Sequence, residues 1–143
     1  MQDHHNLQLP IILSFLNDAR GIIEGGKNRR WEVFKWTIAL NTVLATAALT
    51  KPKLPMALLL LSVLASLMGG FLIEHYDRRM TKARDRARNL VEWIRTNAYI
   101  DMYATMGENT LIPTGAKDAF ERKFFFGTIA ASVIAVAIAL SLK

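Results

Sequence analysis

The stretch Leu54–Ile73, LPMALLLLSVLASLMGGFLI, runs for 20 residues without a single Asp, Glu, Lys, Arg or His. Because an α-helix rises about 1.5 Å per residue, roughly 20 residues cross the hydrocarbon core of a bilayer. Lys53 precedes the stretch and Glu74 follows it, so a charged group falls at each point where a helix would leave the lipid. This stretch therefore predicts a membrane-spanning helix.

Two further uncharged stretches lie on either side of it. Phe124–Leu142 has 19 residues, and Trp36–Thr50 has 15 residues between two lysines. Lysine stems snorkel to the interface, and Trp31, Phe34 and Trp36 are typical of an interfacial aromatic belt. A water-soluble bundle is the alternative, but it would need more polar partner sequence than the chain supplies. We therefore expect an all-α integral membrane protein with three transmembrane helices, at 31–51, 54–74 and 124–142.

The rest of the chain fits one membrane domain over 1–143. The turn Lys51–Pro55 is too short for an extracellular domain, so the first two spans should form a tight antiparallel hairpin. No proline follows until Pro113, which predicts that the second span continues as a cytosolic helix over 75–106. A turn over 107–115 would then return the chain to the membrane.

The basic residues are distributed unevenly. Of the 18 Lys and Arg residues, only Lys51, Lys53 and Lys143 lie outside two segments, one before the first span and one between the second and third spans. Lys and Arg mark the cytoplasmic side of a membrane protein. We therefore expect a multi-pass protein of the cell inner membrane, with its N-terminus and main polar region in the cytoplasm and its C-terminus outside.

A short amphipathic helix is expected over 10–25. Pro10 fits a first helical turn, apolar residues recur at three- and four-residue spacing, and Gly25-Gly26 should end the helix. This helix could lie in the inner interface of the membrane, or pack on another cytosolic helix of this chain or of a neighbouring copy. Basic residues near the inner interface are expected to contact anionic lipid headgroups: Lys27, Arg29, Arg30, Arg78 and Arg79.

The expected cytosolic helix has an apolar seam with three- and four-residue spacing. Such a seam is typical of a helix that pairs with another helix. It therefore needs a partner, in a coil or in a soluble cytosolic protein. Its residues are Met80, Ala83, Ala87, Leu90 and Ile94.

Small residues mark two faces where helices could approach closely. In lipid, such faces favour association because backbones can come near one another. The faces could pack the three spans within one chain or join copies into a homo-oligomer. They consist of Ser62, Ser66 and Gly70 in the second span, and of Gly127, Ala131, Ala135 and Ala139 in the third.

The first span has a polar line. It contains the only amide side chain of the three spans, Asn41. Such a line could face a pore, or the threonine hydroxyls could bond to the carbonyl four residues earlier while Asn41 bonds to a neighbouring helix. Its candidate pore residues are Thr37, Asn41, Thr42 and Thr46.

Catalytic equipment is not evident in the sequence. There is no cysteine, no phosphate-binding or dinucleotide-binding loop and no nucleophile elbow, and Glu74-His75 is typical of an interfacial ion pair. We expect no enzyme activity, no metal and no cofactor. The basic helix is explained by membrane topology, which disfavours nucleic acid as a partner and favours membrane lipid.

The run from Lys27-Asn28-Arg29-Arg30-Trp31 through the hairpin to His75-Tyr76-Asp77-Arg78-Arg79, with its basic helix, resembles the SLATT-type two-transmembrane effector hairpin of bacterial conflict (anti-phage) systems. The similarity covers roughly residues 19–103 and is architectural. It implies assembly or rearrangement in the inner membrane when a partner senses infection, followed by perforation. This chain departs from the pattern by adding a third span.

Two functions follow as expectations. The first is a small bacterial inner-membrane effector that oligomerises into a pore or membrane-disrupting assembly in antiviral defence. The second is a non-catalytic membrane adaptor or structural subunit that recruits a soluble sensor or effector through its cytosolic helices.

Overall fold

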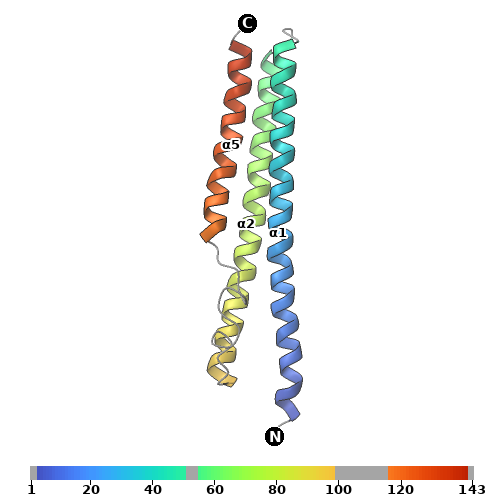
Figure 1. Ribbon diagram of the computed structural model, residues 1–143, viewed down its shortest axis with the longest axis vertical. Helices are drawn as coiled ribbons and strands as arrows, with labels where there is room; N and C mark the ends of the chain where they lie inside the picture. Colours follow the sequence, from blue (N-terminus) through green and yellow to red (C-terminus); the bar gives the residue numbers. More distant parts are fainter. Residues whose placement is uncertain (1–2, 51–54, 99–115, 142–143) are drawn as a thin grey trace. The chain divides into compact units, whose positions relative to one another are not determined.

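The computed structural model describes residues 3–50, 55–98 and 116–141, and all of these residues are helical (Figure 1). The helices are α1 (Asp3–Thr50), α2 (Pro55–Ala98) and α5 (Ala116–Ser141). Each contains a segment long and apolar enough to cross a membrane. The expected all-α architecture with three such helices is confirmed.

Helix α1 does not end at Gly25-Gly26, where the sequence predicted a break. Packing outweighs the low helix propensity of glycine at this point. A Cβ atom built on Gly26 would lie 2.6 Å from Cγ of Met80, so a larger residue at this position would require the Met80 side chain to move. Helix α1 also begins before Pro10, which therefore lies inside the helix rather than in its first turn.

Helix α2 continues past the end of the apolar stretch, as the absence of proline predicted. The segments expected over 54–74 and 75–106 share this one helix as far as Ala98. The rest of the expected cytosolic helix, the turn over 107–115 and the turn at Lys51–Leu54 lie outside the described residues.

The packing divides into two compact units. The first comprises Met1–Lys27 and Asp77–Gly115, and the second comprises Asn28–Tyr76 and Ala116–Lys143. We call them the coil unit and the span unit. Helices α1 and α2 contribute to both, whereas the described residues of α5 lie in the span unit alone.

In the coil unit, the N-terminal part of α1 covers the apolar seam of α2. Leu16 of α1 packs with Ala87, Val91 and Ile94 of α2 in one apolar core. The N-terminal part of α1 therefore packs on a helix of its own chain, which was one of the two alternatives. Met80, Ala83, Ala87 and Ile94 are buried as the seam predicted, but Leu90 is only half-buried and Val91 takes the inward position.

The span unit has its core near the charged ends of its helices. Phe34 of α1, Ile73 of α2, and Phe125 and Ile129 of α5 form this core. Most other large apolar side chains of the three spans are exposed. An apolar exterior of this extent is what a lipid environment requires and water disfavours.

Candidate functional site

A hydrogen-bond network centred on Asn41 joins the three apolar helices of the span unit. The Asn41 side chain is 1% exposed. Its Nδ2 donates to Ser66 Oγ of α2 at 2.9 Å and to Ser132 Oγ of α5 at 2.7 Å. Its Oδ1 accepts a hydrogen bond from Ser62 Oγ of α2 at 2.9 Å. One side chain of α1 thus binds both other spans.

Both the nitrogen and the oxygen of the Asn41 amide have hydrogen-bond partners in this network. Both Nδ2 hydrogens are donated and Oδ1 accepts, while Ser132 Oγ donates onward to the carbonyl oxygen of Ile129 at 2.7 Å. An unsatisfied polar group in hydrocarbon would cost several kcal/mol. The Asn41 network therefore specifies which faces of the three helices meet.

The structure does not place the predicted polar line on a single face. Thr37 and Asn41 are buried between helices, and Thr37 Oγ1 bonds to the carbonyl oxygen of Val33 at 2.8 Å. Thr42 and Thr46 are exposed, and each hydroxyl bonds to a carbonyl four residues earlier, at 2.9 and 3.0 Å. Asn41 therefore bonds between helices and the threonines bond within α1, and a pore lined by the exposed threonines stays a prediction.

The small residues of α2 pack the span unit internally. Ser62, Ser66 and Gly70 are buried. A Cβ on Gly70 would lie 3.1 Å from Cε1 of Phe126, and a Cβ on the neighbouring Gly69 would lie 2.3 Å from Thr37 Oγ1. Gly69 thus lies closely against Thr37 of α1, and Gly70 lies against Phe126 of α5.

The small residues of α5 behave differently. Gly127, Ala131 and Ala135 are exposed, and only Ala139 of the predicted face is buried. Helix α5 instead turns the side chains of Phe125, Ile129 and Val136 inward. The outward small face, Gly127, Ala131 and Ala135, is therefore not used in packing the described residues of the chain.

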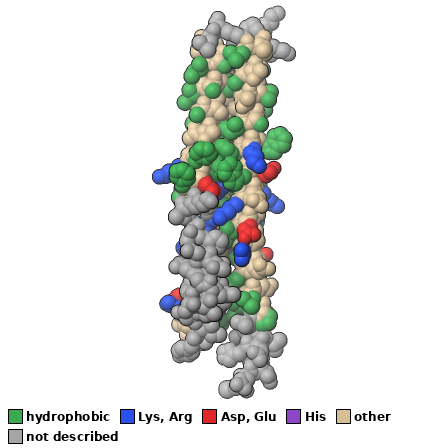
Figure 2. Space-filling model, viewed as in Figure 1, with side chains coloured by type: hydrophobic (Ala, Val, Ile, Leu, Met, Phe, Trp, Pro, Cys, Tyr) green, Lys and Arg blue, Asp and Glu red, His purple; other side chains and the backbone are tan. Residues whose placement is uncertain are grey.

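A buried ion pair closes the charged end of the span unit. The Arg30 side chain is 0% exposed, and its Nη2 donates to Oε2 of Glu121, which lies on α5. The Arg30 guanidinium carbon also lies 5.2 Å from the centre of the Phe125 ring. In Figure 2, Lys, Arg, Asp and Glu side chains are visible from the middle of the view downward, and apolar side chains are visible on the surface above them.

The position of Arg30 corrects one predicted lipid contact. Arg30 was expected to meet anionic headgroups, but it lies inside the protein because Glu121 and Phe125 already surround its charge. Among the other predicted lipid contacts, Arg29, Arg78 and Arg79 are exposed and Lys27 is half-buried.

Aromatic rings cluster around Phe125, the ring that lies beside Arg30. Phe125 lies 4.6 Å from Phe34 and 4.8 Å from Trp31, measured between ring centres. Phe124 lies 6.0 Å from Phe34. The predicted aromatic belt is therefore partly a packed cluster that joins α1 to α5, and Trp36, at 73% exposed, remains on the outer surface.

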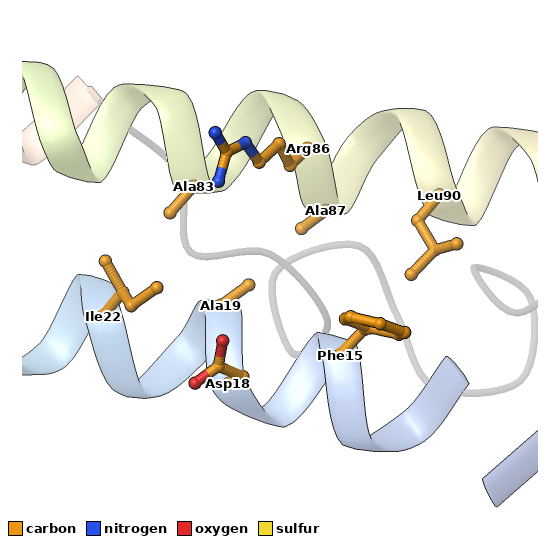
Figure 3. A pocket seen from close by; sticks show the side chains of 8 residues that line it. All are labelled: Phe15, Asp18, Ala19, Ile22, Ala83, Arg86, Ala87 and Leu90. Atoms are coloured by element: carbon orange, nitrogen blue, oxygen red, sulfur yellow. The ribbon is translucent and has the colours of Figure 1, made fainter. Parts of the chain in front are cut away.

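The coil unit contains an open apolar groove of about 420 Å³ between its two helices (Figure 3). Phe15, Ala19 and Ile22 of α1 approach it from one side, and Ala87 and Leu90 of α2 from the other. Asp18 and Arg86 contribute its charged rim. Within 3–50, 55–98 and 116–141, no group of three or more His, Asp or Glu side chains is placed to hold a metal ion.

Comparison with known proteins gives no relative: no family model, curated protein or solved structure matches the chain. The three apolar helices indicate a multi-pass membrane protein on physical grounds.

Proposed function

We propose that the chain is a small effector of a bacterial inner membrane whose copies assemble into a pore or membrane-disrupting oligomer. Its N-terminus and coil unit lie in the cytoplasm, and its C-terminus lies outside. The distribution of Lys and Arg supports this orientation. The architectural resemblance of residues 19–103 to SLATT-type hairpins supports a role in antiviral defence.

The proposal depends on the outward small face of α5. Gly127, Ala131 and Ala135 follow one another at four-residue spacing, so they lie on one side of the helix. Small residues contribute little to contacts with lipid but allow another helix to approach closely. This face is exposed in a single chain. In our proposal, a helix of a second copy packs against it.

The lumen of such an assembly would form between copies. The Asn41 network holds the three spans of one chain together, so the amide is already bonded inside the span unit. Thr42, Thr46 and Thr50 remain on the exposed surface of α1 at four-residue spacing. These hydroxyls are the polar groups that a ring of copies would direct toward water.

Permeability of vesicles tests the proposal. We expect vesicles that contain the purified protein to release a trapped dye, and we expect Ala131→Leu with Ala135→Leu to abolish release because bulk prevents close approach. Ala137→Leu is the matched control, since Ala137 is also exposed on α5 but lies off the small face. Equal release from all three proteins would contradict assembly through this face.

The coil-unit groove favours the adaptor as a second candidate. Phe15 is 62% exposed and Ile22 is 37% exposed, so apolar area beside the groove is open to a soluble partner. Ile94 is not available for docking because it is buried in the coil-unit core. If the chain is an adaptor, Phe15→Lys should release a co-purifying soluble protein, whereas Ile11→Lys, on the same helix but outside the groove lining, should retain it.

A further inference from the structure

An apolar groove of about 500 Å³ runs between α2 and α5 in the span unit. Its walls are the exposed side chains of Leu67 and Phe71 on α2 and of Phe126 and Ile134 on α5. Its volume lies in the range of known small-molecule sites, about 300–1,000 Å³. The groove opens on the apolar surface of the spans, where lipid would surround the protein.

Charged residues lie one helical turn beyond one end of this groove. Arg122 precedes Phe126 by four residues, and Glu74 follows Gly70, another groove residue, by four residues. Residues four apart in a helix share a face, so both lie in line with the groove. Arg122 Nη1 and Glu74 Oε2 are 3.8 Å apart, which shows that α2 and α5 remain neighbours at this point.

Two basic residues of α5, Arg122 and Lys123, lie beyond this end of the groove, where Arg122 contacts Glu74 of α2. Lys123 is exposed and lies three residues before Phe126, on the same side of α5 as the groove. The side chain of Arg122 is 46% exposed, and its Nη1 also contacts Glu74. Arginine and lysine side chains can both bind a phosphate group.

We propose that this groove is a binding site for one anionic phospholipid, which places an acyl chain along Leu67, Phe126 and Ile134 and its phosphate against Arg122 and Lys123. A flexible acyl chain conforms to a groove with bulky walls, whereas a neighbouring helix prefers small residues such as those of the outward small face. The site is separate from the coil unit and from the previously predicted basic contacts. It requires membrane insertion but not pore formation.

Native mass spectrometry of the full chain, released from nanodiscs that contain phosphatidylglycerol and phosphatidylcholine, tests the site. We expect retained phosphatidylglycerol on the wild-type protein and at least a fivefold loss of the lipid-bound fraction in Lys123→Glu. Lys35→Glu is the matched control, because Lys35 is exposed near the charged end of the span unit on α1 but lines no part of this groove. Ala130→Phe should also displace the lipid by filling the groove, whereas Ala39→Phe on α1 should not.

Three outcomes would overturn the site. These are equal retention of phosphatidylcholine, an unchanged lipid-bound fraction in both Lys123→Glu and Ala130→Phe, or a smaller oligomer mass in Ala130→Phe without lipid loss, which would assign the groove to a second copy. Because the same spectra report copy number, loss of the lipid site is distinguishable from failure of the proposed assembly.

Discussion

Asn41 and Ser132 lie 91 residues apart in the chain, and a 2.7 Å hydrogen bond from Asn41 Nδ2 to Ser132 Oγ joins α1 to α5. The same amide also binds both buried serines of α2. Helix association in lipid gains little from apolar burial, so directional bonds of this kind decide which helix faces meet.

We predict that Asn41→Leu lowers the free energy of unfolding in mild detergent by about 1–3 kcal/mol, because three serine hydroxyls lose their shared partner. Thr46→Val is the control, since Thr46 bonds only within α1 and is exposed. It should change the free energy of unfolding by less than about 0.5 kcal/mol. Equal effects of the two substitutions would mean that the network contributes nothing specific.

Gly69→Ala should weaken the contact between α1 and α2. The added Cβ would lie 2.3 Å from Thr37 Oγ1, so the helices must separate or the threonine must rotate away from Val33. We expect a loss of about 1–3 kcal/mol in thermal or chemical unfolding. The double variant with Thr37→Ala should recover part of this loss.

Gly25→Ala is the matched control for Gly69→Ala. Among residues 3–50, 55–98 and 116–141, no atom that the added Cβ at Gly25 would newly meet lies within 4 Å, and Gly25 is inside a helix. We therefore expect stabilisation of about 0.5–1 kcal/mol from improved helix propensity. Destabilisation by Gly25→Ala would contradict the continuous helix α1.

Glu121→Gln should destabilise the protein by about 3 kcal/mol, because it removes the carboxylate that contacts the buried Arg30 guanidinium. The double variant Arg30→Met with Glu121→Leu should be markedly more stable than Glu121→Gln, since it removes both charges of this pair. Circular dichroism during unfolding measures both. If the single and double variants unfold alike, the ion pair is not buried in solution.

The absence of cysteine allows single-cysteine mapping of the membrane orientation. Ser14→Cys, in the coil unit, should react with a membrane-impermeant maleimide only after the cells are opened. Ser141→Cys, near the end of α5, should react in intact spheroplasts. Both residues are exposed, so burial does not limit the reaction. The reverse pattern would invert the proposed topology.

Two of the three apolar helices were predictable because uninterrupted apolar stretches of 19 or 20 residues, such as Leu54–Ile73, have few other stable environments. The third, at Trp36–Thr50, has only 15 such residues and was predicted from its flanking lysines and aromatic residues. The continuation of α2 to Ala98 followed from the lack of proline. The seam was predicted except at its fourth position. There Val91 is buried in place of Leu90. The predicted seam steps three residues from Ala87 to Leu90, whereas the buried residues step four from Ala87 to Val91.

Other features depend on contacts that sequence spacing does not reveal. Gly25-Gly26 has the signature of a helix end, but the close approach of Met80 to Gly26 favours continuation. Arg30 has the position of an interfacial basic residue, and its partner Glu121 lies 91 residues later. Nothing in the order of residues distinguishes it from Arg29, which is exposed.

The polar line of α1 is another feature whose contacts the sequence spacing does not reveal, here for residues that are adjacent in the chain. Asn41 and Thr42 are neighbours in sequence, yet successive residues in a helix point about 100° apart. One therefore faces the helix interface and the other faces outward. The spacing alone left both the pore and the hydrogen-bonding interpretations open.

The most direct test of the account is the native mass of the full chain in lipid nanodiscs, compared between the wild type and Ala135→Leu. We predict a closed assembly of four or more copies for the wild type, since three spans are too few to enclose a water-filled lumen, and smaller species for the variant. A wild-type protein that is monomeric, or an oligomer whose mass Ala135→Leu leaves unchanged, would contradict assembly through the outward face of α5.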